Sequence, residues 1–325
     1  MTPQSLQVLV TGASGFVGRQ LCHDLLQAGF TVKAAMRKLP AHPVAGEPLV
    51  VDLGDSDAMN IAMRGVDVVV HLAARAHVLD DRSSDPLAAF RQANVVTSLS
   101  VARSAVAAGV KRFIFVSSIG VNGAETTGLP FSESMQPQPN ALYAVSKLEA
   151  EQQLEALFAG HDTELVIIRP PLVYDAAAPG NFSRLLWLVG KKWPLPFAFV
   201  NNRRSMISLG NLTNFIGLAI KHESAAGELF VIADGESLST RQIVQSLALG
   251  MGYRARLFFV PRLAMSGLLR LVGRHNIFSQ LYGSLEVDTS KAERVLGWVP
   301  PEAPRQALAA AGRRFKEQSA YNTGR

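Results

Sequence analysis

The chain has 325 residues, which is enough for one large domain or for two fused ones. Hydrophobic residues make up 48% and charged residues 18%, and this balance excludes a disordered chain. The only cysteine, Cys22, excludes an internal disulfide and a zinc site built from several cysteines. Because we find neither a secretory signal nor a run of about 20 uncharged apolar residues, we expect a cytoplasmic protein with no transmembrane helix.

The formal net charge of +6 is unevenly distributed along the chain. Residues 1–160 hold 12 Lys and Arg against 14 Asp and Glu, whereas residues 161–325 hold 20 against 12. The basic second half favours an anionic partner such as a phosphorylated small molecule, a nucleic acid or an acidic membrane surface. No more than two basic residues are adjacent, so we expect no nucleic-acid binding.

Short apolar runs alternate with helical patterns over the first half of the chain. The runs are rich in Val, Ile and Phe and almost continuously apolar, as in strands that are buried on both faces. This alternation predicts parallel βαβ units and a doubly wound sheet. The predicted strands are 6–11, 31–36, 48–53, 66–72, 112–118 and 164–169, and the predicted helices are 16–28, 55–63, 86–108 and 140–158.

The pattern changes after residue 169, where prolines break the chain into short pieces. One further strand is predicted over 228–233, and amphipathic stretches over 263–272 and 305–315. We therefore predict an α/β protein: a Rossmann-type domain over 1–170, to which 205–233 return, and a smaller substrate-binding domain over 171–325. The apolar, arginine-flanked stretch 262–272 suits packing in the second domain, an oligomer interface or a membrane surface.

A glycine-rich turn follows the first predicted strand and precedes the first predicted helix. Gly12, Gly15 and Gly18 have the spacing of a dinucleotide-binding loop. Gly12 permits the tight turn, Gly15 lets the backbone approach a pyrophosphate, and Gly18 allows the helix to pack closely on the strand. Residues 11–18 are therefore predicted to hold the phosphates of a nicotinamide dinucleotide.

The end of the second predicted strand bears on which nicotinamide cofactor is bound. NAD sites usually place an Asp or Glu there to bond the adenosine ribose, but no acidic residue occurs between Asp24 and Glu47. Arg37 and Lys38 stand at that position instead. Because an arginine can bind a 2′-phosphate through two hydrogen bonds, we expect NADP(H) to be preferred, with NAD(H) as the alternative.

Tyr143 and Lys147 are four residues apart near the start of a predicted helix, which puts both on one helix face. A free phenol has a pKa near 10. We expect the ammonium of Lys147, together with an oxidised nicotinamide, to lower the pKa of Tyr143. Ser118 ends the fifth predicted strand and is expected to bond the substrate oxygen. These three residues are the predicted catalytic group.

The chain resembles the extended short-chain dehydrogenases/reductases of the nucleotide-sugar epimerase/dehydratase group. The resemblance implies that Lys147 bonds the nicotinamide ribose and that Asn94 supports the active-site helix. The motifs that carry it are Thr11–Gly18, 51–53, 71–74, 94–95, 117–118, Tyr143–Lys147, 169–170 and, more weakly, 296–298. The cofactor residues that it implies besides these are Ser14, Phe16, Val17, Asp52, Leu53, Leu72, Ala73, Ala74, Ser117, Tyr143 and Pro170.

Within this group the chain is similar to bacterial enzymes that reduce a UDP-4-keto-6-deoxy-N-acetylhexosamine at C4 during synthesis of O-antigen or lipopolysaccharide. The similarity lies in 71–78, 116–123 and 202–205. It implies that Asn181 and Arg204 contact the UDP part of the substrate, although Asn181 could instead cap the following helix. The second phosphate arginine of related epimerases has no clear match; Arg274 is a possible replacement.

The sequence is compatible with three functions. The first is an NADPH-dependent 4-ketoreductase, the second a UDP-sugar 4-epimerase that retains NAD, and the third a non-catalytic NADP(H) sensor on the same fold. A dehydratase is disfavoured because Ser118 is followed by Ile119 and Gly120 rather than by an Asp-Glu pair. No metal site is predicted. Homodimerisation through helices 86–108 and 140–158 is expected from the resemblance.

Overall fold

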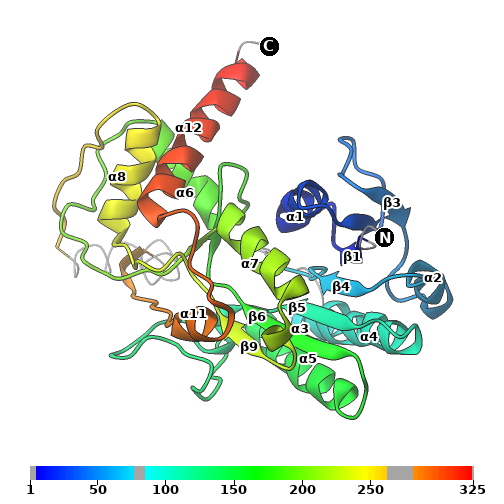
Figure 1. Ribbon diagram of the computed structural model, residues 1–325. Helices are drawn as coiled ribbons and strands as arrows, with labels where there is room; N and C mark the ends of the chain where they lie inside the picture. Colours follow the sequence, from blue (N-terminus) through cyan, green and yellow to red (C-terminus); the bar gives the residue numbers. More distant parts are fainter. Residues whose placement is uncertain (1–4, 77–84, 262–280, 324–325) are drawn as a thin grey trace.

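The computed structural model describes residues 5–76, 85–261 and 281–323, and Figure 1 shows their arrangement. Parallel strands form a central sheet in the order β3-β2-β1-β4-β5-β6-β9. The predicted doubly wound α/β fold is confirmed. The strands are β1 (Gln7–Thr11), β2 (Thr31–Met36), β3 (Glu47–Val50), β4 (Val68–His71), β5 (Arg112–Val116), β6 (Glu164–Arg169) and β9 (Leu229–Val231).

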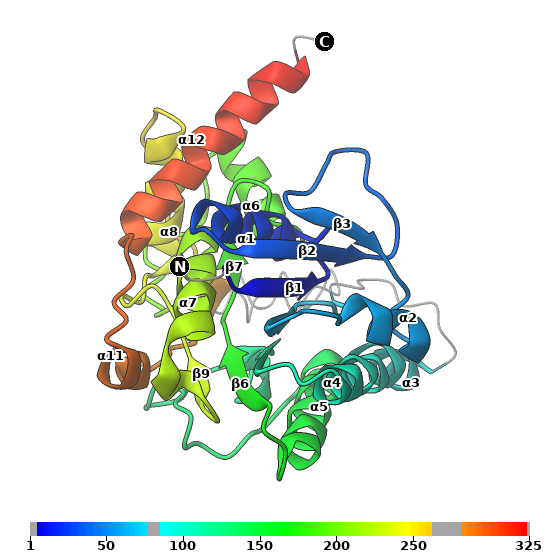
Figure 2. The same cartoon turned by 45° about the vertical axis from the view of Figure 1, so that its right-hand side comes forward.

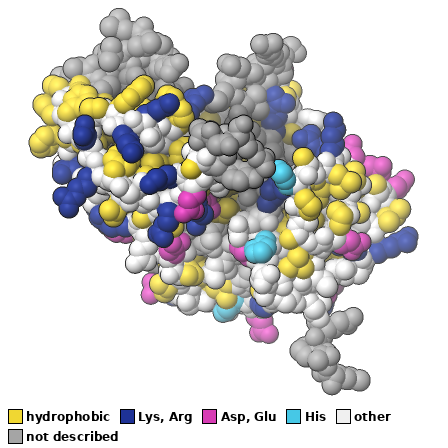
Figure 3. Space-filling model, turned by 90° about the horizontal axis from the view of Figure 1, so that it is seen from above, with side chains coloured by type: hydrophobic (Ala, Val, Ile, Leu, Met, Phe, Trp, Pro, Cys, Tyr) yellow, Lys and Arg dark blue, Asp and Glu magenta, His cyan; other side chains and the backbone are white. Residues whose placement is uncertain are grey.

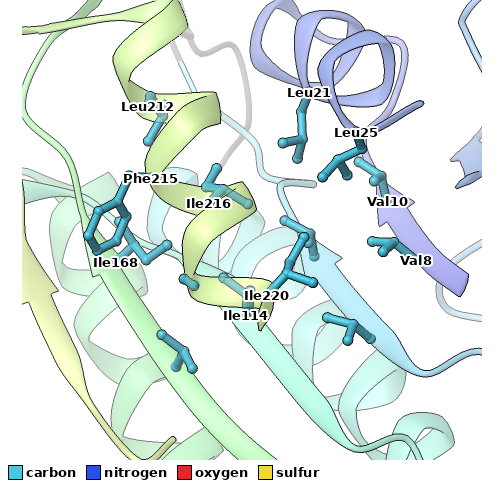
Figure 4. Packing of buried hydrophobic residues seen from close by; sticks show 14 of the residues in the cluster. Val8, Val10, Leu21, Leu25, Ile114, Ile168, Leu212, Phe215, Ile216 and Ile220 are labelled. Atoms are coloured by element: carbon cyan, nitrogen blue, oxygen red, sulfur yellow. The ribbon is translucent and has the colours of Figure 1, made fainter. Parts of the chain in front are cut away.

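Both faces of the sheet are covered by helices, as Figure 2 shows. Successive side chains of a strand point to opposite faces, so Val8 and Val10 join one hydrophobic cluster and Leu9 joins the other. In Figure 4, Val8 and Val10 lie beneath Leu21 and Leu25 of α1. The first face carries α1 (Phe16–Gln27) and α7 (Leu209–Lys221); the second carries α2 (Ser56–Ala62), α4 (Thr97–Ala107) and α5 (Leu142–Phe158).

A third hydrophobic cluster lies beside the sheet and forms the core of a small helical domain. Phe182, Leu186, Leu247 and Leu308 are fully or almost fully buried there. Its helices are α6 (Asn181–Gly190), α8 (Thr240–Gly250) and α12 (Pro304–Thr323), and a shorter helix, α11 (Ser290–Leu296), packs on the first face of the sheet through Ala292 and Leu296. Of these only α12 overlaps a helix predicted from sequence, at 305–315.

A buried carboxylate joins the small domain to the sheet. Asp234 follows β9 and accepts hydrogen bonds from the hydroxyl of Tyr174 at 2.7 Å, the backbone N–H of Ser208 at 2.9 Å and the amide of Asn211 at 2.7 Å. Tyr174 and Ser208 belong to a second, two-stranded sheet formed by β7 (Val173–Tyr174) and β8 (Ile207–Ser208). Burial raises the pKa of Asp234 to about 6 despite these donors.

The predicted helix 86–108 is interrupted in the structure. It comprises α3 (Pro86–Arg91), a π-helical turn over Gln92–Val96 and then α4. The hydroxyl of Thr97 donates to the carbonyl of Gln92, 3.1 Å away, within the widened turn. The sequence could not reveal this turn, because an inserted residue leaves the apolar periodicity nearly unchanged. The predicted stretch 263–272 and the candidate Arg274 lie outside the described residues.

Candidate active site

The order of the sheet reverses between β1 and β4, so the connections that leave their carboxyl ends run to opposite faces of the sheet and open a crevice. Thr11 and His71 are paired at these ends. The chain turns at Gly12, which has a φ of +69°. A Cβ on Gly18 would lie 2.3 Å from the carbonyl oxygen of Gly12, so only glycine lets α1 approach the turn this closely. The loop therefore presents backbone N–H groups and the N-terminus of α1 to the crevice.

A groove runs along this crevice and fits the predicted dinucleotide site. It extends from the glycine loop past the ends of β2 and β4. Its lining includes the predicted residues Gly12, Ser14, Gly15, Arg37, Asp52, Leu53, Leu72, Ala73 and Ala74. Sequence reasoning missed Ala35, Met36, Arg75, Ala76, Ala93 and Thr97, which also line it, because most are small side chains that matter only through their position at strand ends or on the π-turn.

Other predicted cofactor residues lie outside the lining of this groove. Phe16 packs against the hydrophobic cluster of the small domain, and Val17 packs against the cluster under α1 and α7. Ser117 is buried, and its hydroxyl has no hydrogen-bond partner among the described residues. The carbonyl of Pro170 accepts a hydrogen bond from the N–H of Ile119. Their contact with a cofactor stays a prediction.

Tyr143 and Lys147 both lie on the first two turns of α5. The ring of Tyr143 meets the ring of Phe90 edge-on, with centroids 6.3 Å apart. Lys147 is 1% exposed, and its ammonium lies over the ring of Phe115 at 3.9 Å from the centroid. Burial lowers the pKa of Lys147 to about 7, while the carboxylate of Glu151, one turn further along α5, opposes this shift.

The expected lowering of the phenol pKa does not occur in the cofactor-free protein. Burial raises the pKa of Tyr143 to about 12, because a phenolate would be poorly solvated at this position. Tyr143 is therefore held as a neutral phenol, a form that can donate a proton. The expected lowering applies to the protein with an oxidised nicotinamide bound, and for that state it stays a prediction.

A buried ion pair supports the next turn of α5. Arg169, at the end of β6, contacts Glu151 at 2.5 Å, and their side chains are 5% and 2% exposed. Arg169 also donates to the side-chain oxygen of Asn122 at 3.0 Å. A buried charge without its partner is costly, so these residues lock α5 to the end of β6. Arg169 was predicted only as part of a family motif, and its ion pair with Glu151 was not predicted.

A chain of buried hydrogen bonds links the glycine loop to Tyr143. His71 lies between the hydroxyl of Thr11 at 2.9 Å and the hydroxyl of Ser98 at 3.0 Å. Ser98 donates to the carbonyl of Asn94 at 2.6 Å, and the amide of Asn94 donates to Ser146 at 2.9 Å. The hydroxyl of Ser146 in turn donates to the backbone carbonyl of Tyr143 at 2.7 Å.

The π-turn makes this chain possible. It carries Asn94, whose side-chain oxygen also accepts the backbone N–H of Arg75 at 2.7 Å. Asn94 thus contacts both the loop after β4 and α5. His71 is fully buried, and burial followed by repulsion from Lys147 lowers its pKa to about 3. It therefore stays a neutral ring within the chain.

Ser118 lies where β5 gives way to a short 3-10 turn, Ile119–Val121. Its hydroxyl accepts the N–H of Gly120 at 3.1 Å. A Cβ on Gly120 would lie 3.3 Å from both the Cβ of Ala144 and the hydroxyl oxygen of Ser118. The serine loop therefore rests against the first turn of α5, next to Tyr143. Ser118, Tyr143 and Lys147 are placed by neighbouring elements at one end of the sheet.

Two arginines near the cofactor site, Arg19 and the predicted Arg37, have different environments. Arg19 donates to the carbonyls of Ser14 at 3.0 Å and His42 at 3.2 Å, so its guanidinium fixes the loops on either side. Arg37 is exposed and lines the groove at the end of β2. Of the two, Arg37 has the freer side chain for an added phosphate.

The two predicted substrate residues lie in the small domain. Asn181 is the first residue of α6, and the N-cap position belongs to Gly180, so the alternative that Asn181 caps this helix is wrong. Arg204 bridges two segments: its backbone pairs with Leu238 and Leu285, and its guanidinium reaches the carbonyl of Gly283 at 3.4 Å. Burial lowers the pKa of Arg204. Its neighbour Arg203 points outward and pairs with Glu286.

In the described residues no group of three His, Cys, Asp or Glu side chains is arranged to hold a metal ion. Within the same ranges no helix combines the length and apolar character needed to cross a bilayer. Cys22 is buried in the core under α1, and His77 lies outside the part of the chain that the structure describes.

Comparison with known proteins agrees with this geometry. The model of the "NAD dependent epimerase/dehydratase family" matches residues 8–189. A Vibrio cholerae protein described as UDP-glucose 4-epimerase is 38% identical over 315 residues, covering 95% of each chain. An Escherichia coli O157:H7 protein described as N-acetyl-α-D-glucosaminyl-diphospho-ditrans,octacis-undecaprenol 4-epimerase is 32% identical over 240 residues, covering 73% of this chain and 70% of that one.

A solved structure supports the fold as a whole. A short-chain dehydrogenase/reductase superfamily protein from Agrobacterium tumefaciens, with bound NAD, superposes with a TM-score of 0.77 at 21% identity. The superposition covers 98% of this chain and all of that one. The likeness therefore extends over the small domain as well as the sheet.

The depressed pKa of Lys147 predicts a pH dependence of stability. The unfolded chain binds this proton up to about pH 10.5, whereas the folded protein releases it near pH 7. The free energy of unfolding should therefore rise between pH 7 and 9.5, by at most about 1.4 kcal/mol per pH unit from this group. Urea unfolding of cofactor-free wild type and Lys147→Met measures this: the variant should lack that part of the rise. Parallel pH profiles would contradict the assignment.

Proposed function

Because the chain belongs to the NAD-dependent epimerase/dehydratase family, we propose that it reduces the C4 ketone of a UDP-4-keto-6-deoxy-N-acetylhexosamine with NADPH, in the synthesis of a bacterial surface polysaccharide. The proposal rests on two features that occur in the same site: the neutral phenol of Tyr143, and Arg37 at the end of the groove where the adenosine ribose would lie. The first supplies a proton donor for reduction, and the second favours the cofactor that cells use as a reductant.

The nicotinamide, when bound, supplies or accepts a hydride. Tyr143 donates its phenolic proton to O4 as the carbonyl carbon is reduced, so that the ketone becomes an alcohol. Lys147 stabilises the phenolate that remains, and its pKa near 7 lets it carry either charge at physiological pH. Ser118 bonds the same oxygen and orients the carbonyl toward the phenol. A proton from solvent restores Tyr143.

The diphosphate of the substrate is assigned to the small domain. Arg204 is half-buried, its guanidinium reaches the carbonyl of Gly283, and the charge of Glu125 partly offsets the cost of its burial. A partly desolvated arginine binds phosphate oxygens strongly. Asn181 begins α6, where backbone N–H groups also attract an anion. We propose that these two residues hold the UDP part.

A UDP-sugar 4-epimerase is the second candidate. The specific observation in its favour is the V. cholerae relative, which is described as such an enzyme and matches over almost the whole chain. An epimerase would oxidise C4, turn the ketone and return the hydride, and so would need Tyr143 as a base as well as an acid. It would also keep its NAD bound through each turnover.

A homodimer is proposed for the assembly, through α3, α4 and α5. These helices lie together on the second face of the sheet, and Arg91 of α3 pairs with Glu149 of α5 at 2.6 Å. Val96 and Leu142 are 49% and 44% exposed on this side. A second copy would cover such apolar side chains.

The proposed reaction is tested with purified protein, NADPH and enzymatically made UDP-4-keto-6-deoxy-N-acetylglucosamine. We expect loss of nicotinamide absorbance equal to the alcohol formed. Tyr143→Phe should bind NADPH normally yet lose at least about a hundredfold in kcat, because the general acid is gone. Conversion of UDP-N-acetylglucosamine to its galacto epimer without added reductant would instead establish the epimerase. NADPH binding with neither activity would favour the sensor.

The preference for NADP(H) is tested separately at Arg37. Arg37→Asp should weaken NADPH binding at least about tenfold, since it removes a charge-assisted phosphate contact and adds repulsion. NADH binding should be unchanged or tighter, because an aspartate can bond the ribose hydroxyls. Fluorescence titration with both cofactors measures the ratio of the two Kd values. Arg64→Asp, an exposed site beyond the groove, is the charge control. An unchanged ratio in Arg37→Asp would refute the preference.

A further inference from the structure

Large aromatic side chains are exposed on one side of the small domain. Trp187 and Trp193 are 53% and 58% exposed, and their rings meet edge-on with centroids 6.3 Å apart. Phe199 and Phe259 form a second edge-on pair at 5.3 Å. Phe258 is also exposed. We call these five residues the aromatic surface: Trp187, Trp193, Phe199, Phe258 and Phe259.

The two ring pairs belong to one continuous piece of structure. The segment after α6 runs beside the segment after α8: the N–H of Leu195 donates to the carbonyl of Arg256, and the N–H of Phe258 donates to the carbonyl of Leu195. Ala198 and Phe258 are joined in the same way. Because these backbone bonds fix both segments, the aromatic rings are held in place without being buried.

The aromatic surface lies in an unusually basic part of the chain. Residues 176–222 and 237–285 contain no Asp or Glu. Lys191 lies over the ring of Trp187 at 5.1 Å, and Lys192 lies over Tyr253 at 5.6 Å. Neither lysine forms an ion pair within the described chain. Figure 3 shows hydrophobic and basic side chains interspersed on the side of the molecule that carries α6 and α8.

Lys192 has a backbone conformation that lysine rarely adopts. Its φ is +58°, and within the described residues it is the one non-glycine residue with a positive φ. It follows α6, where glycine commonly ends a helix. A lysine here puts a second cation next to Lys191 at the expense of backbone strain. The sequence thus keeps a charge where conformation favours glycine.

We propose that the aromatic surface and its two lysines dock the protein on an anionic lipid bilayer. Rings with an apolar body, above all Trp, partition to the boundary between lipid headgroups and acyl chains. Lysines beside them attract anionic headgroups, and the two stretches that carry the aromatic surface contribute no carboxylate to oppose this attraction. Apolar insertion and charge act together, as reversible membrane binding requires. The proposal does not depend on which sugar is bound.

The proposal is tested by sedimenting the full-length protein with sucrose-loaded vesicles of phosphatidylcholine alone or of phosphatidylcholine mixed with phosphatidylglycerol, an anionic lipid that attracts basic side chains. We expect binding to the anionic vesicles and little to the zwitterionic ones. Lys191→Gln/Lys192→Gly should weaken this binding about tenfold or more, since each cation near such a surface contributes roughly fivefold. Lys192→Gly also removes the backbone strain, so the loss cannot come from unfolding. Trp187→Gln/Trp193→Gln should also abolish binding.

Matched controls come from the opposite side of the molecule. Ile61→Gln removes an exposed apolar side chain of α2, and Arg64→Glu removes a cation; both should bind as wild type does. Brominated lipids should quench Trp187 and Trp193, whereas Trp298 is buried and serves as an unquenched reference. No binding to anionic vesicles, or binding without this quenching, would overturn the proposal. Self-association that the Trp variant abolishes, without vesicle binding, would show instead that a second copy covers the surface.

Discussion

The active site depends on a buried chain of hydrogen bonds that runs from Thr11 through His71, Ser98 and Asn94 to the first turn of α5. It joins the end of β1, which shapes the glycine loop, to the helix that carries Tyr143. Unmade hydrogen bonds in a buried place are costly, so each member fixes the next. The groove and the proton donor are thereby held in one geometry before any ligand arrives.

The pKa values of Tyr143 and Lys147 then follow from how deeply this geometry buries each side chain. Tyr143 and Lys147 share a dry helix face, and desolvation disfavours the charged form of both. The phenol is kept protonated and the amine is brought close to neutrality. A ligand that excludes water and adds charge changes this balance, so substrate and cofactor binding set the protonation state in which the chemistry proceeds.

Sequence could predict what depends on local pattern. Buried strands, the glycine turn, the Tyr143–Lys147 spacing and the basic end of β2 all follow from residue type and periodicity. It could not predict the π-turn at Asn94 or the pairing of Glu151 with Arg169, because both depend on tertiary contacts between distant segments. The same limit applies to the burial of Tyr143, which raises the pKa of its phenol in the cofactor-free protein. Helices α6, α7 and α8 were not predicted from the sequence.

In the proposed reaction the C4 carbonyl of a nucleotide sugar receives a hydride from the nicotinamide and a proton from Tyr143. The most direct measurement uses NADPH carrying deuterium at the transferable position of the nicotinamide, with the product examined by NMR. We expect one deuterium at C4 of the sugar, together with loss of the H4 signal. A reduced product with hydrogen at C4, or deuterium on any other carbon, would contradict it.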